Sequence, residues 1–143
     1  MFYGEYQHGL DAKNRAVIPS KFRAALGSRF MLTRGWDKCL VVYTMDKWGA
    51  LAEKVSPLPT ADEEVRWFTR AMFSKAAECE PDAQGRVLIP GKLREYAGIE
   101  RDIVFVGAFE RIEIWSLENW DKYNSEEQFD AEAVAAKMAE LGV

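Results

Sequence analysis

Two stretches of the chain repeat one another, and this duplication constrains the fold more than any other sequence feature. Residues 11–23 read DAKNRAVIPSKFR and residues 82–94 read DAQGRVLIPGKLR, with seven of 13 positions identical at an offset of 71. Further matches are Met1–Phe2 with Met72–Phe73, Gly27 with Gly98 and, after a one-residue insertion, Tyr43–Trp48 with Trp115–Trp120. Most of the chain therefore consists of two copies of one structural unit.

Each copy begins with a segment whose pattern predicts a hairpin and a short helix. Extended segments at 3–10 and 76–80 lead through an Asp-x-x-Asn/Gly-Arg turn into the apolar stretches 16–18 and 87–89. Asn14 and Gly85 stand where such a turn needs a positive φ, and the side chains of Asp11 and Asp82 can accept backbone N–H groups there. Pro19 and Pro90 suit the first turn of a helix, Gly27 and Gly98 suit its end, and Phe22, Leu26, Leu93 and Ala97 fall on its apolar side.

The rest of each copy predicts a second hairpin. Residues 30–33 with 40–43, and 103–106 with 112–115, read as strand pairs, the last strand of each alternating between buried and exposed positions. A helix over about 61–72 is expected to link the copies, opened by a capping box at Thr60. A second helix is expected to open at 125–128. Residues 55–59 are expected to form a loop.

A unit of this size exposes too many strand edges to be stable alone. We therefore expect an α+β fold in which the two copies pair into one pseudo-symmetric, barrel-like core with peripheral helices. The expected divisions are a first repeat at 5–48, a linking helical segment at 49–75, a second repeat at 76–120 and an acidic C-terminal helix at 121–143.

Motifs for catalysis and metal binding are missing from the sequence. It has no serine elbow, no lysine-bearing phosphate loop and no pair of metal-binding histidines. His8 is interpreted as a structural or surface residue, and Cys39 and Cys79 as reduced, buried thiols. No signal peptide or membrane-spanning segment is expected, so the protein should be soluble and intracellular. Five tryptophans are interpreted as core or interface anchors rather than base-stacking platforms: Trp36, Trp48, Trp67, Trp115 and Trp120.

Charge is distributed unevenly along the chain. The formal net charge is -4, which taken whole argues against a nucleic-acid partner. The two repeat segments, however, hold seven cations and two anions, whereas residues 116–143 hold two cations and seven anions. If the copies pair, the basic turns can gather on one face, which is the electrostatic pattern of a phosphate-binding surface.

Three other interpretations of the repeat remain open at this point. The Asp11–Arg15 and Asp82–Arg86 strings could simply be ion pairs that stabilise the turns, worth about 0–1 kcal/mol each. The basic face could instead dock the acidic C-terminal helix of a neighbouring chain, in a non-DNA assembly module. An enzyme using these Asp and Arg residues in a cleft has only His8 and ordinary carboxylates to support it.

At these residues the sequence resembles the MraZ family. The resemblance is carried by Met1–Phe2 with Gly4–Tyr6, Asp11–Arg23, Leu32–Gly35, Phe68–Arg70, Cys79–Glu80 and Gln84–Val87. It implies two AbrB-like (SpoVT-AbrB) swapped-hairpin units. It further implies a DNA-binding transcriptional regulator of the division and cell-wall gene cluster, which binds repeated sites upstream of its own operon. A ring-like homo-oligomer in the cytoplasm, associated with the nucleoid, is also implied.

Two departures from the family pattern stand beside the turns. The family usually has Gly where this chain has Asn14, and an apolar residue where it has Pro81. Because Asn tolerates positive φ, the first turn is expected to be kept. Pro81 puts in doubt only the strand pairing just before the second turn.

The family's Asp-x-x-x-Arg signature falls on Asp11 with Arg15 and on Asp82 with Arg86. We expect double-stranded DNA and further copies of the chain as partners, and no membrane, small-molecule substrate, cofactor, metal or catalytic residue. The expected DNA-binding residues are Arg15, Arg86, Lys13, Lys21, Arg23, Lys92 and Arg94. The expected turn-structuring residues are Asp11, Asn14, Asp82 and Gly85.

Overall fold

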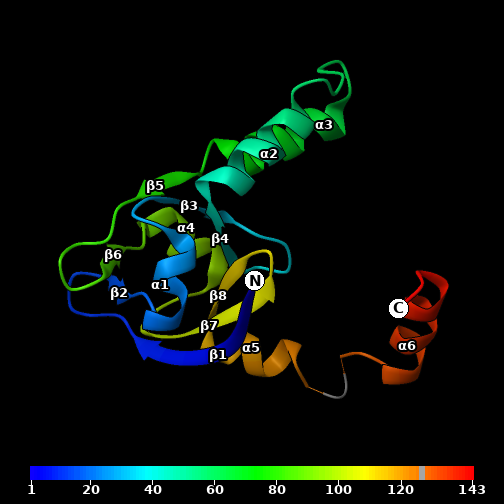
Figure 1. Ribbon diagram of the computed structural model, residues 1–143. Helices are drawn as coiled ribbons and strands as arrows, with labels where there is room; N and C mark the ends of the chain where they lie inside the picture. The colour runs from blue at the N-terminus through cyan, green and yellow to red at the C-terminus, as the bar shows by residue number, and fades with distance from the viewer. Residues whose placement is uncertain (126–127) are drawn as a thin grey trace.

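The two copies of the repeat fold into equivalent sets of elements in the computed structural model, which describes residues 1–125 and 128–143 (Figure 1). The first copy comprises β1 (Phe2–Gly9), β2 (Arg15–Val17), α1 (Ser20–Leu26), β3 (Phe30–Arg34) and β4 (Leu40–Thr44). The second comprises β5 (Ala77–Cys79), β6 (Arg86–Leu88), α4 (Gly91–Ala97), β7 (Asp102–Phe109) and β8 (Ile112–Ser116). The α+β class and the two-copy organisation are confirmed.

Four further helices lie outside these sets. They are α2 (Met45–Val55), α3 (Glu63–Phe73), α5 (Leu117–Tyr123) and α6 (Ala131–Glu140). Helices α2 and α3 project together from the sheet at the end away from β2 and β6, and α6 stands apart from the body (Figure 1).

The strands pair between the copies rather than only within them. One antiparallel sheet has the order β1-β7-β8-β4-β3-β5, and β2 and β6 form a separate two-stranded ribbon. Exchanging each strand for its equivalent in the other copy gives the same order read from the opposite edge of the sheet. The register keeps the same symmetry, because Ala16 faces its equivalent Val87 and Val41 faces its equivalent Glu113. A pseudo-two-fold axis therefore passes through the ribbon and through the β4–β8 pair.

The second predicted hairpin of each copy is confirmed, but the first is wrong. Strand β3 pairs with β4, and β7 with β8. Strand β1 instead pairs with β7 and β5 with β3, while β2 pairs only with β6. The turn still closes locally, because Asn14 N–H donates to the Asp11 carbonyl and Asp11 N–H donates to the Arg15 carbonyl. The strands on either side of the turn then diverge to partners in the other copy, which a local pattern does not reveal.

One core is shared by both copies. It contains equivalent pairs such as Ile18 and Ile89, together with Phe22 and Leu93. The expected alternation in the last strand is wrong for β4, since Leu40, Val41 and Val42 are all buried, whereas β8 alternates over Ile112, Glu113 and Ile114. Strand β4 lies in the middle of the sheet, so side chains on both of its faces are covered.

The short helices follow the sequence signals closely. Helices α1 and α4 begin directly after Pro19 and Pro90, and end at Gly27 and Gly98, both of which have positive φ. The four predicted apolar residues of these helices, Phe22, Leu26, Leu93 and Ala97, are buried.

The boundaries of the longer helices differ from expectation. Helix α3 is capped by Asp62 rather than Thr60, because the Asp62 carboxylate accepts from the N–H groups of Glu64 and Val65. Helix α6 is capped by Asp130, so the expected opening at Ser125 is wrong, and residues 126–127 of that expectation lie outside the described residues. Helices α2 and α5 were not anticipated as separate elements.

Candidate nucleic-acid interface

The β2–β6 ribbon presents one covered face and one exposed face. Ala16 and Val87 point into the core and are buried. Because successive side chains of a strand point to opposite faces, the residues on either side of them point outward. These outward residues are Arg15, Val17, Arg86 and Leu88, and the ribbon occupies one end of the molecule (Figure 1).

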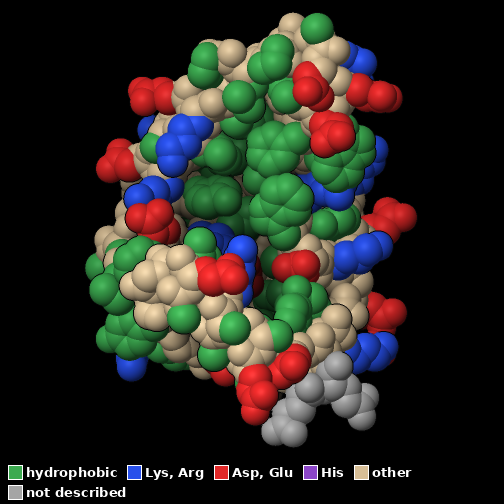
Figure 2. Space-filling model, turned by 90° about the vertical axis from the view of Figure 1, so that its right-hand side faces the viewer, with side chains coloured by type: hydrophobic (Ala, Val, Ile, Leu, Met, Phe, Trp, Pro, Cys, Tyr) green, Lys and Arg blue, Asp and Glu red, His purple; other side chains and the backbone are tan. Residues whose placement is uncertain are grey.

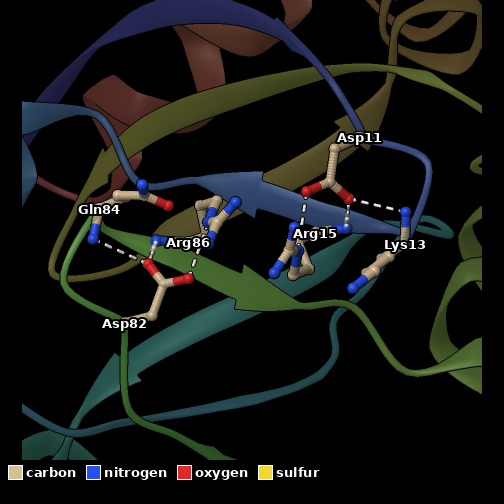
Figure 3. Close-up of polar contacts among 6 residues, drawn as sticks. All are labelled: Asp11, Lys13, Arg15, Asp82, Gln84 and Arg86. Carbon is tan, nitrogen blue, oxygen red and sulfur yellow. Dashed lines mark hydrogen bonds and ion pairs between the residues drawn. The ribbon is translucent and has the colours of Figure 1, made fainter.

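The turn before each strand of the ribbon is built around one aspartate (Figure 3). Asp11 Oδ1 accepts from the N–H groups of Lys13 and Arg15, each at 2.9 Å. Asn14 adopts φ 59°, as the sequence predicted, and its N–H closes the turn on the Asp11 carbonyl at 3.0 Å. Three hydrogen bonds thus fix the backbone over five residues.

The second turn repeats this geometry atom for atom. Asp82 Oδ1 accepts from the N–H groups of Gln84 and Arg86, each at 2.9 Å. Gly85, at φ 78°, takes the place of Asn14 and donates its N–H to the Asp82 carbonyl. The predicted turn-structuring residues therefore lie where the repeat placed them.

Each aspartate also holds an arginine of the ribbon. Arg15 Nε donates to Asp11 Oδ2 and Arg86 Nε donates to Asp82 Oδ2, both at 2.7 Å. The backbone N–H of the arginine, followed by its side chain, lowers the pKa of each Asp carboxyl below its ordinary value. Both pairs are partly exposed, so the guanidinium groups are fixed in direction while remaining accessible from outside.

The register brings the two arginines close together. Arg15 lies opposite Leu88 and Arg86 lies opposite Val17, so the arginines occupy diagonal positions on the exposed face (Figure 3). Diagonal neighbours of this kind are roughly 7–8 Å apart. Two guanidinium groups from segments 71 positions apart in the sequence thus share one small surface.

The two turns are held by each other's copy. Ile18 N–H donates to the Gly85 carbonyl at 2.9 Å, and Ile89 N–H donates to the Asn14 carbonyl at 3.0 Å. Arg23 Nε then binds the Ile18 carbonyl at 3.0 Å. In the same way Arg94 Nε binds the Ile89 carbonyl at 2.9 Å.

The predicted basic residues therefore divide into three groups. Arg15 and Arg86 lie together on the ribbon, while Arg23 and Arg94 tie the following helices to the ends of its strands. The lysines are exposed, at the first turn or at the starts of α1 and α4: Lys13, Lys21 and Lys92.

Val17 and Leu88 were missed by the sequence-based prediction. Both are exposed apolar residues on the same ribbon face as the arginines. The alternation of the three-residue strands around buried Ala16 and Val87 was the signal that could have identified them.

The cysteine and histidine side chains of the described residues are buried or half-buried. Cys39 and Cys79 are buried free thiols, and burial raises the pKa of both, that of Cys79 to about 11. His8 is half-buried and packs edge-on against Phe105. Within residues 1–125 and 128–143, no cluster of three His, Cys, Asp or Glu side chains is arranged to hold a metal ion. None of the described helices has the length and apolar character needed to span a membrane.

The tryptophans only partly follow the prediction. Trp115 is buried and packs against Trp120, and Trp48 packs against Phe73. Trp36 and Trp67, in contrast, are more than half exposed.

Comparison with known proteins agrees with the duplicated fold. The family model described as "MraZ protein, putative antitoxin-like" matches twice, over residues 1–71 and 72–141. A protein of Acetivibrio thermocellus named transcriptional regulator MraZ is 51% identical over 143 residues, covering 100% of both chains. Proteins of the same name from Clostridium tetani and Caldicellulosiruptor bescii are 52% and 50% identical, again over 100% of both chains. Their shared name describes a regulator rather than an enzyme. Because two family matches cover nearly every residue and full-length relatives share about half of them, this chain belongs to the MraZ family.

Proposed function

We propose that this protein is a DNA-binding transcriptional regulator whose β2–β6 ribbon enters the major groove. The observation that carries the proposal is the pair of Asp-anchored arginines, Arg15 and Arg86, on the exposed face of a two-stranded ribbon. The major groove of B-DNA is wide enough to admit such a ribbon. The names of the full-length relatives, which are transcriptional regulators, support the same role.

The anchoring of each arginine suits the recognition of a base edge. Asp11 and Asp82 each accept a hydrogen bond from the Nε atom of the arginine in the same turn. The outer nitrogens of each guanidinium can then donate as a fork to the N7 and O6 atoms of guanine. Because the side chain is already held in one direction, little conformational freedom is lost on binding DNA.

The remaining basic residues would position the ribbon. Lys13, Lys21 and Lys92 are exposed cations suited to phosphate contacts, which set register but carry no sequence information. We assign Arg23 and Arg94 first to holding the ribbon and only secondarily to phosphate, because their Nε atoms bind main-chain carbonyls.

One chain offers few contacts, so selective binding requires several copies on successive DNA sites. Linking binding modules in this way raises overall affinity by about 10²–10⁴-fold without new contacts. We therefore propose a homo-oligomer that binds repeated sites upstream of its own gene cluster, as the family resemblance implies. The proposed target is the division and cell-wall gene cluster, and the proposed location is the nucleoid.

The experiment compares two DNA duplexes by fluorescence anisotropy at two salt concentrations. One duplex carries the repeats upstream of the chain's own gene and the other a scrambled sequence of equal composition. Arg15→Ala is expected to lower affinity for the repeats by roughly 10–100-fold, because a bidentate arginine contact is worth about 1–3 kcal/mol. Arg15→Lys keeps the charge but loses the fork, so it should lose specificity while retaining salt-dependent binding.

Lys54→Ala serves as the matched control, because it removes one exposed cation from α2, at the far end of the molecule from the ribbon. It should leave binding unchanged. Equal affinity of the Arg15→Ala protein and the unmodified protein for the repeats would contradict the proposal. Equal affinity for repeat and scrambled DNA, together with a salt-sensitive oligomer, would favour the assembly-module alternative instead.

A further inference from the structure

Helix α6 presents an apolar stripe that its own chain does not cover. Val134, Met138 and Leu141 are exposed, and they follow one another at the spacing of a single helix face. Every described residue from 128 to 143 is exposed, and the segment meets the body where Phe129 packs on Tyr123. An i, i+4, i+7 stripe is the usual set of anchors by which a helix docks into a groove.

A cleft with aromatic walls lies open elsewhere on the same chain. It has a volume of about 130 Å³ and lies between α3, the β3–β4 loop and α4, lined by Trp36, Trp67, Phe68 and Tyr96. Seen from the side on which α3 and α6 lie, hydrophobic side chains gather in a hollow with charged side chains around it (Figure 2). Trp36 and Trp67 are among the most exposed aromatic side chains of the described residues.

The walls of the cleft are held in place before anything binds. Trp36 stacks on Phe68 with ring centroids 6.0 Å apart. The Arg34 guanidinium lies between two rings, 4.2 Å from the Tyr96 centroid and 5.4 Å from that of Trp67. Tyr96 Oη donates to the Gly35 carbonyl at 2.8 Å. A preformed apolar cleft loses little conformational freedom when it is filled.

The charges around the cleft and on α6 are also complementary. The hollow next to the cleft shares Arg34 and Trp67 with it and is lined further by Arg66, Arg70 and Lys75 against the one carboxylate of Glu63. The α6 segment from 130 to 143 carries three carboxylate side chains and one lysine. A basic rim beside an apolar cleft thus fits an acidic helix with an apolar stripe.

We propose that α6 of one chain docks into the Trp36–Trp67 cleft of a second copy. Among the described residues, no hydrogen bond, ion pair or aromatic contact joins α6 to the cleft of the same chain, so each copy offers one surface of each kind. A contact of this type is head-to-tail, and it generates a ring if the rotation between copies closes. The inference rests on the proposed function in one respect, because it supplies a contact for the proposed homo-oligomer. It involves none of the ribbon residues.

The first test measures the molar mass of the full chain in solution by light scattering. Met138→Glu places a charge in the apolar stripe and is expected to dissociate the assembly. Ala136→Glu puts the same residue on the opposite face of the same helix and should leave the mass unchanged. Trp67→Ala, at an exposed position on the cleft wall, should dissociate the assembly as Met138→Glu does. An unchanged mass for Met138→Glu and Trp67→Ala would overturn the proposal.

The second test separates docking between chains from docking within one chain. Chains carrying Met138→Cys and chains carrying Trp67→Cys are co-expressed with different tags and oxidised. A disulfide between the two kinds of chain is expected, because α6 and the cleft would come from different copies. The native Cys39 and Cys79 are buried and should not interfere. Absence of a disulfide between the two kinds of chain would overturn the proposal.

These outcomes are distinguishable from failure of the proposed function. Met138→Glu should retain affinity for a duplex with one site and lose the additional affinity for a duplex with several sites. Arg15→Ala should lose affinity for both duplexes while keeping the mass of the assembly.

A second inference rests on the proposed function and on a different observation. The register places Leu88 directly opposite Arg15 and Val17 directly opposite Arg86, so each arginine has an exposed aliphatic neighbour on the ribbon face. Thymine carries the one methyl group that the four bases present in the major groove, and apolar side chains contact it. We infer that Leu88 and Val17 contact thymine methyl groups beside the base pairs that the arginines read.

Deoxyuridine tests this inference, because it lacks only that methyl group. Replacing thymine by deoxyuridine in the repeat duplex is expected to weaken binding of the unmodified protein by about 4-fold for each contacted methyl group, the effect of losing one buried methyl-sized group. Leu88→Ala should bind the thymine duplex more weakly and show a smaller response to the replacement. The inference fails if the replacement weakens binding equally for the unmodified protein and for Leu88→Ala, or if it weakens binding for neither. The proposed function would stand in that event as long as Arg15→Ala lost binding.

Discussion

The aspartate of each turn combines two tasks at the scale of single residues. Oδ1 of Asp11 and Asp82 accepts two backbone N–H groups, while Oδ2 accepts the arginine Nε at 2.7 Å. One carboxylate thus closes the turn with one oxygen and directs the arginine outward with the other. A surface ion pair alone contributes little to stability. We therefore interpret the Asp-x-x-x-Arg pattern as a device that orients a side chain.

The lowered pKa of both carboxyls predicts how stability depends on pH. A group whose folded-state pKa lies below its unfolded value stabilises the fold above the unfolded pKa and loses that effect as the pH falls through the folded pKa. For Asp11 and Asp82 the loss should begin near pH 3.8, the ordinary value, and continue below it.

The double variant Asp11→Asn/Asp82→Asn checks this expectation in urea unfolding. An amide can still accept backbone N–H groups through its oxygen but presents no second acceptor to the arginine Nε. The variant should be less stable than the unmodified protein near neutral pH, and the two should converge below about pH 4. Asp121→Asn, at an exposed position on α5, is the control. A stability difference that stays constant down to pH 2 would contradict the assignment.

Gly85 is the turn residue with the least room for a side chain. It adopts φ 78°, and a Cβ there would collide with the Arg23 guanidinium that packs over the turn. Gly85→Ala should cost about 1–2 kcal/mol of unfolding free energy, the usual cost of a left-handed conformation for a residue with a Cβ. Chemical denaturation would measure it. Asn14→Gly, at the equivalent position, should change stability little, and a large loss there would show that the two turns are not equivalent.

At the scale of elements, helix α3 is attached to the sheet by one buried hydrogen bond. Thr33 is fully buried, and its hydroxyl donates to the Met72 carbonyl at 2.6 Å. Thr33 belongs to β3 and Met72 to the last turn of α3, so the bond joins the linking segment to the first copy. The cleft wall that we propose as a docking surface depends on this attachment.

Thr33→Val should loosen α3, because it leaves the Met72 carbonyl without its donor in a buried place. The expected loss is about 1–3 kcal/mol in the free energy of unfolding, measured in urea. Hydrogen exchange of the amides of α3 should also become faster. Thr33→Ser keeps the hydroxyl and should lose no more than about 1 kcal/mol. A loss in Thr33→Ser as large as the loss in Thr33→Val would contradict the prediction, because the hydrogen bond would then contribute no more than the methyl group.

Helices α2 and α5 were not evident as separate helices from the local sequence pattern. Each begins directly after a strand, at Thr44 and Ser116, whose side chains cap it by accepting the N–H groups of Lys47 and Asn119. The repeat matched these segments to each other. The predicted helical segments at 49–75 and 121–143 overlap α2 and α5 only in part, and neither was predicted as a separate helix. Short helices of this kind are stabilised mainly by packing, which depends on neighbours distant in the sequence.

At the scale of the whole molecule, the two copies are interlocked rather than joined end to end. Strands β1, β2, β4 and β5 all pair with strands of the other copy, so neither copy contains its own complete sheet. Neither half therefore has a separate core.

Separate halves should accordingly fail to fold as monomers. Fragments 1–75 and 76–143, divided in the exposed turn before β5, should each lack a dispersed NMR amide spectrum or pair with a second copy of themselves. Mixing them should restore the spectrum of the intact chain, because each supplies the strands that the other lacks. A native-like monomer from either fragment alone would contradict the interlocked fold.

The net charge of -4 takes on a different meaning in the folded molecule. The basic turns lie at one end, whereas α6 and its carboxylates stand apart from the body. We interpret the acidic total as a restraint on indiscriminate DNA binding by a single chain. Several ribbons aligned by assembly would overcome that restraint.

Four features of the fold can be read from the amino-acid sequence: the duplication, the two Asp-based turns, the short helices that follow them and the second hairpin of each copy. These features depend on contacts within a few residues, such as the positive φ of Asn14 and Gly85 and the helix starts after Pro19 and Pro90. Only the tertiary structure decided that β1 and β2 part to different partners, and that Arg15 and Arg86 share one ribbon face. The physical reason is that strand pairing satisfies backbone hydrogen bonds between distant segments, and a periodic pattern shows which side of a strand is buried but not which strand lies beside it.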